Sequence, residues 1–152
     1  MNTGLDRIRK LYSEAGGNSL KAAQLHQELA LAPENDPVWT AYRAASEALQ
    51  AKNAWNPFEK LMRIQEAQRI FAKAVEAAPE NVEIRFLRFS IQANTPALLG
   101  LSQEIRADKQ KILANLAEAE LPEKMRPAIA DYLIQSGVCQ PPEIAFLKTL
   151  LD

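Results

Sequence analysis

Residues 56–81 read NPFEKLMRIQEAQRIFAKAVEAAPEN, and this stretch decides the fold class. Asn56 followed by Pro57 predicts a helix start, because asparagine caps free N–H groups and proline fits the first helical turn. Beyond them, apolar and charged side chains separate onto two sides at three- and four-residue spacing, as in an amphipathic helix. The apolar side holds Phe58, Leu61, Phe71, Ala74, Val75 and Ala78, and the charged side holds Glu59, Lys60, Arg63, Glu66, Arg69, Lys73 and Glu76. We expect a helix over Pro57–Ala78.

The rest of the chain carries the same kind of signal. Strong helix formers dominate, prolines separate the segments, and no stretch shows the alternation that is typical of a strand. Asn94-Thr95-Pro96 closes one helix and opens another, which Gly100 interrupts and which restarts over Ser102–Leu116. The remaining expected helices are Leu5–Ala15, Ser19–Leu31, Pro37–Lys52, Val82–Ala93, Glu123–Ser136 and Pro142–Leu150.

A short motif recurs along the chain. Ala32-Pro33-Glu34-Asn35 returns as Ala78-Pro79-Glu80-Asn81, and Leu121-Pro122-Glu123 forms a third copy, so that the prolines are 46 and 43 residues apart. A period of this length with two helices per unit is typical of a solenoid of helical hairpins. We therefore expect one domain over residues 1–152: an all-α, right-handed solenoid of about three to four stacked antiparallel hairpins.

The pattern Ala67-x3-Phe71-x2-Ala74-x4-Pro79 resembles the second helix of a tetratricopeptide repeat. The resemblance implies paired helices that approach closely through alanines, in a fold that serves protein binding. The resemblance covers about one helix of the chain. The repeat period is longer than the family's ~34 residues, and an extra turn, Asn53-Ala54-Trp55-Asn56, separates the first helix from its partner. A repeat of HEAT-like length and an irregular helical bundle remain alternatives. Residues 83–96 are also similar to a stretch of uncharacterised bacterial proteins, which implies no activity.

Composition narrows the class of protein. The 152 residues are 47% hydrophobic and 24% charged, as in globular proteins. The 18 basic and 19 acidic residues give a net charge of −1, which argues against nonspecific nucleic-acid binding. No apolar run reaches the roughly 20 residues of a membrane-spanning helix, and the first residues lack a signal-peptide core. The single cysteine excludes an internal disulfide. We expect a cytoplasmic protein without membrane insertion, although the removal of a signal peptide stays open.

The sequence offers no catalytic constellation. It lacks a phosphate loop, a dinucleotide fingerprint, and zinc or di-iron ligand sets. We expect His26 to be a surface or groove residue and Cys139 to be an inert apolar residue. Glu104 and Asp108 lie one helical turn apart, as an acid/base pair would, but basic neighbours favour a solvated charged face. Those neighbours are Arg106, Lys109 and Lys111. We predict that the protein is not an enzyme and needs no metal or cofactor.

Two groups of residues are candidates for binding. Arg85, Arg88 and Gln92 share the side of their helix that the apolar stripe leaves free. The arginines either pair with internal acids, such as Glu76 or Glu80, or bind a partner's carboxylate or phosphate from a concave wall. Trp55 lies in a polar turn, where it either packs onto the stack or is an exposed anchor. The other aromatic residues of this region are expected in the core, namely Trp39, Tyr42 and Phe58.

The leading hypothesis is a non-enzymatic module that binds a protein or peptide partner. The predicted contacts are Arg85, Arg88, Gln92 and Trp55, followed by Lys60 and Asn94. One alternative is a binder of small anions with a pocket between hairpins. Another is a self-assembling subunit that oligomerises through its apolar C-terminal helix, with Ile144, Phe146, Leu147, Leu150 and Leu151; that helix could equally pack back as a cap.

Overall fold

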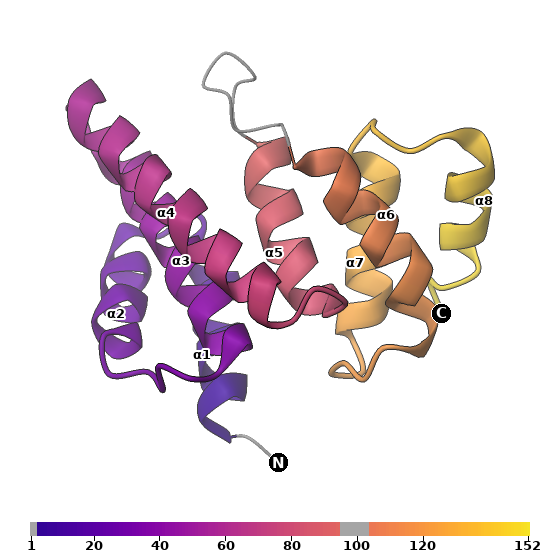
Figure 1. Ribbon diagram of the computed structural model, residues 1–152, viewed down its shortest axis with the longest axis horizontal. Helices are drawn as coiled ribbons and strands as arrows, with labels where there is room; N and C mark the ends of the chain where they lie inside the picture. Colours follow the sequence, from indigo (N-terminus) through magenta and orange to yellow (C-terminus); the bar gives the residue numbers. More distant parts are fainter. Residues whose placement is uncertain (1–2, 95–103) are drawn as a thin grey trace. The chain divides into compact units, whose positions relative to one another are not determined.

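The computed structural model describes residues 3–94 and 104–152 (Figure 1). Over these residues the chain forms helices and no strand, which confirms the predicted all-α class. The elements are α1 (Thr3–Ala15), α2 (Ser19–Leu29), α3 (Pro37–Asn53), α4 (Pro57–Ala77), α5 (Val82–Ala93), α6 (Ile105–Asn115), the 3-10 turn η2 (Leu116–Glu118), α7 (Met125–Gln135) and α8 (Pro141–Lys148). The expected helix signals at Thr95, Pro96, Gly100 and Ser102 lie outside the described residues.

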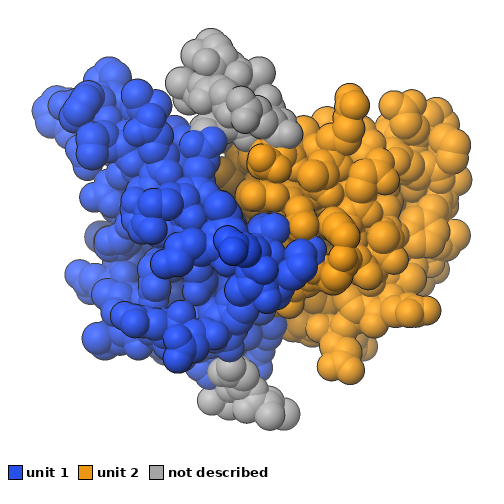
Figure 2. Space-filling view, viewed as in Figure 1, with its two compact units in different colours: residues 1–79 blue, residues 80–152 orange. Residues whose placement is uncertain are grey.

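The chain divides into two compact units, Met1–Pro79 and Glu80–Asp152 (Figure 2). Unit 1 contains α1 to α4 and unit 2 contains α5 to α8. The expectation of a single domain stays a prediction.

Side-chain caps explain why α2, α3, α4 and α5 begin where the sequence predicts. The Asn56 side chain accepts hydrogen bonds from the backbone N–H groups of Phe58 and Glu59, at 2.8 and 3.3 Å. Asn81 caps α5 in the same way through the N–H of Ile84, at 3.0 Å. The first turn of a helix has no internal acceptors for these N–H groups, so a polar side chain before the helix fixes its start. The predicted bounds Val82–Ala93 are accordingly those of α5.

Unit 1 is built around α3. This helix packs along α4, from which three residues separate it, and it also contacts α1 and α2. Small buried side chains line both helices of the α3–α4 pair: Ala41, Ala44 and Ala45 on α3, and Ala67 and Ala74 on α4. Tyr42 is buried and meets the ring of Tyr12 edge-on, with centroids 5.7 Å apart. Small alanine side chains allow the two paired helices to approach closely.

Unit 2 has its own hydrophobic core, to which all four of its helices contribute. The buried members are Val82, Phe89, Ile112, Leu116, Ile129, Ala130, Leu133 and Leu147. Tyr132 of α7 meets Phe86 and Phe89 of α5 edge-on, at centroid distances of 5.3 and 6.3 Å. Helix α5 packs on α6, and α7 packs on α8. This packing brings the polar side of α5 against α6.

One predicted helix face was wrong. Phe58 and Leu61 were expected on the same side of α4 as Phe71, yet Phe71 is buried whereas Phe58 is 70% exposed. The buried stripe follows Ala67, Ile70, Phe71 and Ala74. The first two turns of α4 carry apolar residues on several sides, so their periodicity could not define which side faces the core.

Candidate functional site

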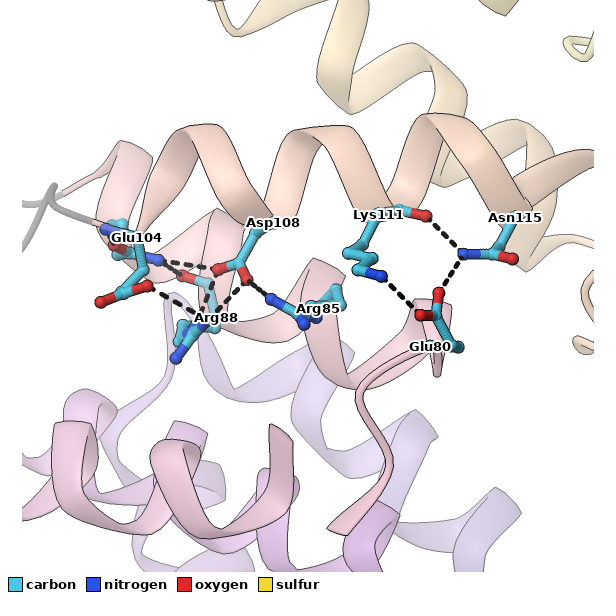
Figure 3. A network of polar contacts seen from close by, with 8 residues as sticks. Glu80, Arg85, Arg88, Glu104, Asp108, Lys111 and Asn115 are labelled. Atoms are coloured by element: carbon cyan, nitrogen blue, oxygen red, sulfur yellow. Dashed lines mark hydrogen bonds and ion pairs between the residues drawn. The ribbon is translucent and has the colours of Figure 1, made fainter. Parts of the chain in front are cut away.

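The predicted binding residues of α5 converge on one carboxylate, that of Asp108 in α6 (Figure 3). Arg88 donates from Nε and Nη2 to the two carboxylate oxygens, both at 2.8 Å. Arg85 donates from Nη1 at 3.0 Å, and Gln92 donates from Nε2 at 2.9 Å. Asp108 itself is fully buried. The structure therefore brings Arg85, Arg88 and Gln92 together, but around an acid of the same unit.

Glu104, directly before α6, completes the polar network around Asp108. The Gln92 Oε1 atom accepts a hydrogen bond from the backbone N–H of Glu104 at 3.0 Å, and Arg88 Nη2 lies 3.8 Å from a Glu104 carboxylate oxygen. No buried side-chain nitrogen or oxygen in the described part of the chain lacks a hydrogen-bond partner. A buried polar network that is fully satisfied fixes the register of the two helices that it joins.

The interpretation of the α6 charges as a solvated face was wrong for two residues. Asp108 is buried in the network, and Lys109 is buried with Nζ donating to the carbonyl of Val138 and to Glu143, both at 3.1 Å. The exposed member of the supposed acid/base pair is Glu104. Of the two interpretations of Arg85 and Arg88, pairing with an acid of the same chain is therefore the one observed, and that acid is Asp108. A role of these arginines in partner binding stays a prediction that this geometry does not support.

Glu80, one of the acids expected near the arginines, makes a different contact. Its carboxylate accepts hydrogen bonds from Lys111 Nζ and, at 3.1 Å, from Asn115 Nδ2 (Figure 3). The contact with Lys111, assisted by Asn115, lowers the pKa of Glu80. This second bridge joins the segment before α5 to the end of α6.

Asn94 has a structural contact as well. It ends α5, and its Nδ2 donates to the backbone carbonyl of Ser90 at 2.9 Å and to the hydroxyl of Tyr132 at 2.7 Å. The Tyr132 hydroxyl donates to the same Ser90 carbonyl at 3.2 Å. Burial raises the pKa of Tyr132, while the hydrogen bond from Asn94 opposes that shift.

Two predicted contacts remain, Trp55 just before α4 and Lys60 in its first turn. Trp55 is 94% exposed, and the interpretation that it packs onto the stack was wrong. Phe58, Leu61 and Met62 follow it at three- and four-residue spacing and are 70%, 40% and 54% exposed. We call these four residues the α4 apolar face. Lys60 is exposed in the same two turns.

Sequence reasoning missed Leu61 and Met62 as surface residues. It placed Leu61 in the core and gave Met62 no role. The available signal was the spacing Trp55, Phe58, Met62, which continues from the polar turn into the helix.

The histidine and cysteine do not form an activated nucleophile. Both Ser46 Oγ, at 3.4 Å, and Glu47 Oε1, at 3.8 Å, approach the same His26 nitrogen, Nδ1. A nucleophile–base–acid relay needs the two groups on opposite ring nitrogens, and Ser46 is buried. Burial, with the charge of Glu143, raises the pKa of the half-buried Cys139 thiol, which disfavours the reactive thiolate.

The pocket of about 490 Å³ in unit 2 has acidic walls. Its lining includes four glutamates, Glu80, Glu83, Glu118 and Glu120.

Among the described residues, no three His, Cys, Asp or Glu side chains gather so as to hold a metal ion. Within the same residues, no helix has the length and hydrophobicity that crossing a bilayer requires.

Comparison of the chain with known protein families, with curated proteins and with solved structures finds no match.

Proposed function

We propose that this protein is a non-enzymatic interaction module, a tetratricopeptide-like scaffold of helical hairpins, and that its docking surface is the α4 apolar face. The observation that carries the proposal is the exposure of four large hydrophobic residues, Trp55, Phe58, Leu61 and Met62, within eight positions of the chain. Scattered surface hydrophobics are ordinary, but a contiguous group of this kind marks an interaction surface.

The residue types support protein binding. Tryptophan supplies large contact area and is enriched among the residues that dominate interface energies. The face is held in place, because Asn56 caps the helix directly between Trp55 and Phe58 and the buried side of α4 packs on α3. A rigid helix that presents an apolar row suits a partner with a complementary apolar surface.

The alternative of an anion-binding pocket has less support. Both candidate guanidinium groups already bind Asp108, and the glutamates that line the large pocket of unit 2 repel anions. For the same reason the arginines are poor positions at which to test partner binding. Replacing both leaves Asp108 buried without its charge partners, so lost binding would reflect lost folding.

The proposal is tested by replacing Phe58 with the photo-crosslinking residue p-benzoylphenylalanine and irradiating cells that produce the protein. We expect a discrete protein adduct from position 58 and none from Gln27, an exposed position on α2 that serves as the control. Equal labelling from both positions, or no adduct from position 58 in a folded protein, would contradict the proposal.

A further inference from the structure

The α4 apolar face lies opposite to the side that α4 buries. At about 100° per residue, Phe58, Leu61 and Met62 fall within about 100° of arc. Ala67 and Ala74, which are buried, fall on the other side of the helix. Trp55 lies in the non-helical turn directly before α4, two residues from its first residue. Such a surface is convex, because it is the outer side of one helix, and it therefore fits another helical surface better than a small ligand.

The size of the face matches what a pair of identical surfaces needs. An aromatic side chain offers about 150–250 Å² for burial, so the four side chains together present on the order of 500 Å². Two such faces in contact bury on the order of 1,000 Å² in total, the lower limit for a specific protein–protein interface. A second copy of the chain thus supplies an equal area, and complete burial of both faces reaches this lower limit.

The charges around the face also suit a second copy. Arg63 binds Glu47 at 3.0 Å and Glu59 at 3.4 Å, and Arg69 binds Glu66. With Lys60, these side chains are three acids and three bases, so the charges in this region sum to zero within one chain. Two identical faces therefore meet without net electrostatic repulsion. A strongly acidic or basic peptide would meet no surface of opposite charge there.

We infer that the α4 apolar faces of two copies pack against each other, so that the protein forms a homodimer with two-fold symmetry. In such an isologous interface each contact occurs twice. A two-fold axis that passes near Phe58 perpendicular to α4 makes the two α4 helices antiparallel and places Trp55 of each copy near Met62 of the other. The inference rests on the proposed function, because it names the partner of the same face.

Sedimentation velocity of the full chain from about 1 μM to several hundred μM tests the inference. We expect the wild type to shift from monomer to dimer with rising concentration, and Phe58→Glu to raise the dissociation constant at least about tenfold, as for an interface hot spot. The matched control is Leu31→Glu, at an isolated leucine that is 89% exposed, which should associate like the wild type. Because the interface is apolar, added salt should not weaken the dimer.

Folding is checked by circular dichroism; both substituted positions are exposed, so native helicity is expected. A wild type that stays monomeric over the whole range overturns the inference, as does a dimer that Phe58→Glu leaves unchanged. A dimer lost through Phe146→Ser instead would assign self-association to α8 and likewise overturn it. A monomer whose position 58 still crosslinks to a different protein retains the proposed function but not the inference. A monomer without any adduct removes both.

Discussion

Arg88 binds Asp108 through two hydrogen bonds of 2.8 Å, one from Nε to Oδ2 and one from Nη2 to Oδ1, and the carboxylate is fully buried. Such a two-pronged contact fixes both distance and orientation. Arg85 and Gln92 complete the coordination of the same carboxylate. The polar side of α5 is thus a structural contact with α6, and Asp108 is its centre.

Asp108→Ala should strongly destabilise unit 2. Removing one partner of a buried ion pair leaves the other charges uncompensated, and the cost is roughly 3–5 kcal/mol in the free energy of unfolding. Urea denaturation followed by circular dichroism measures it. Asp131→Ala, at an exposed position on α7, is the control and should change stability by less than about 0.5 kcal/mol. Equal effects of the two substitutions would show that the network contributes little.

Ala67→Leu should destabilise unit 1 by about 1–3 kcal/mol, because added methylene groups force a packed core to shift. Ala67 is buried on α4. The matched control is Ala72→Leu, an exposed position on the same helix, which should be nearly neutral. Thermal and urea unfolding of both variants tests the expectation. A neutral Ala67→Leu would mean that the helix surface is not closely packed there.

Glu143 should make the stability of unit 2 depend on pH. Its carboxylate accepts a hydrogen bond from the backbone N–H of Gln140 at 2.7 Å and binds Lys109. Both contacts lower the pKa of Glu143, and the contact with Gln140 has the larger effect. A lowered folded-state pKa means that the stabilisation is complete above the ordinary glutamate value of about 4.3 and is lost as pH falls through the lower folded value. The difference in unfolding free energy between wild type and Glu143→Gln should therefore shrink in acid. Glu123→Gln, at an exposed site, should give a difference that is small at every pH.

Cys139 should react slowly with alkylating reagents at neutral pH. Burial, together with the charge of Glu143, raises the pKa of the thiol, so the thiolate fraction at pH 7 is smaller than in an unfolded chain. We expect the rate with iodoacetamide to be several-fold lower in the folded protein than in urea, and to keep rising at pH values where the unfolded chain has levelled off. Faster reaction in the folded state at pH 7 would refute this expectation.

Local sequence signals were sufficient for the starts of α2 to α5. Asn56 and Asn81 place helix starts because a cap acts on N–H groups two or three residues away, and the bounds of α5 and most of α4 follow from them. The side of α5 that carries Arg85 and Arg88 was also readable, because the spacing of residues along one helix fixes which of them share a side.

The spacing of residues within α5 could not show which residue contacts the side that carries Arg85 and Arg88. Asp108 lies 20 residues beyond Arg88 and stands among basic residues, which suggested a solvated surface. One signal was present: Asp108, Ile112 and Leu116 follow at four-residue spacing, so the acid continues a buried apolar stripe. Only the packing of α6 on α5 decides that this stripe faces the arginines.

The sequence by itself therefore determined the all-α class, the starts of the capped helices α2 to α5 and the shared side of Arg85, Arg88 and Gln92, since these depend on interactions between residues a few positions apart. The tertiary structure decided that Asp108 is buried and that Trp55 and Phe58 are exposed. Both outcomes depend on which helix covers which side of another, and that is set by contacts between segments far apart in the chain.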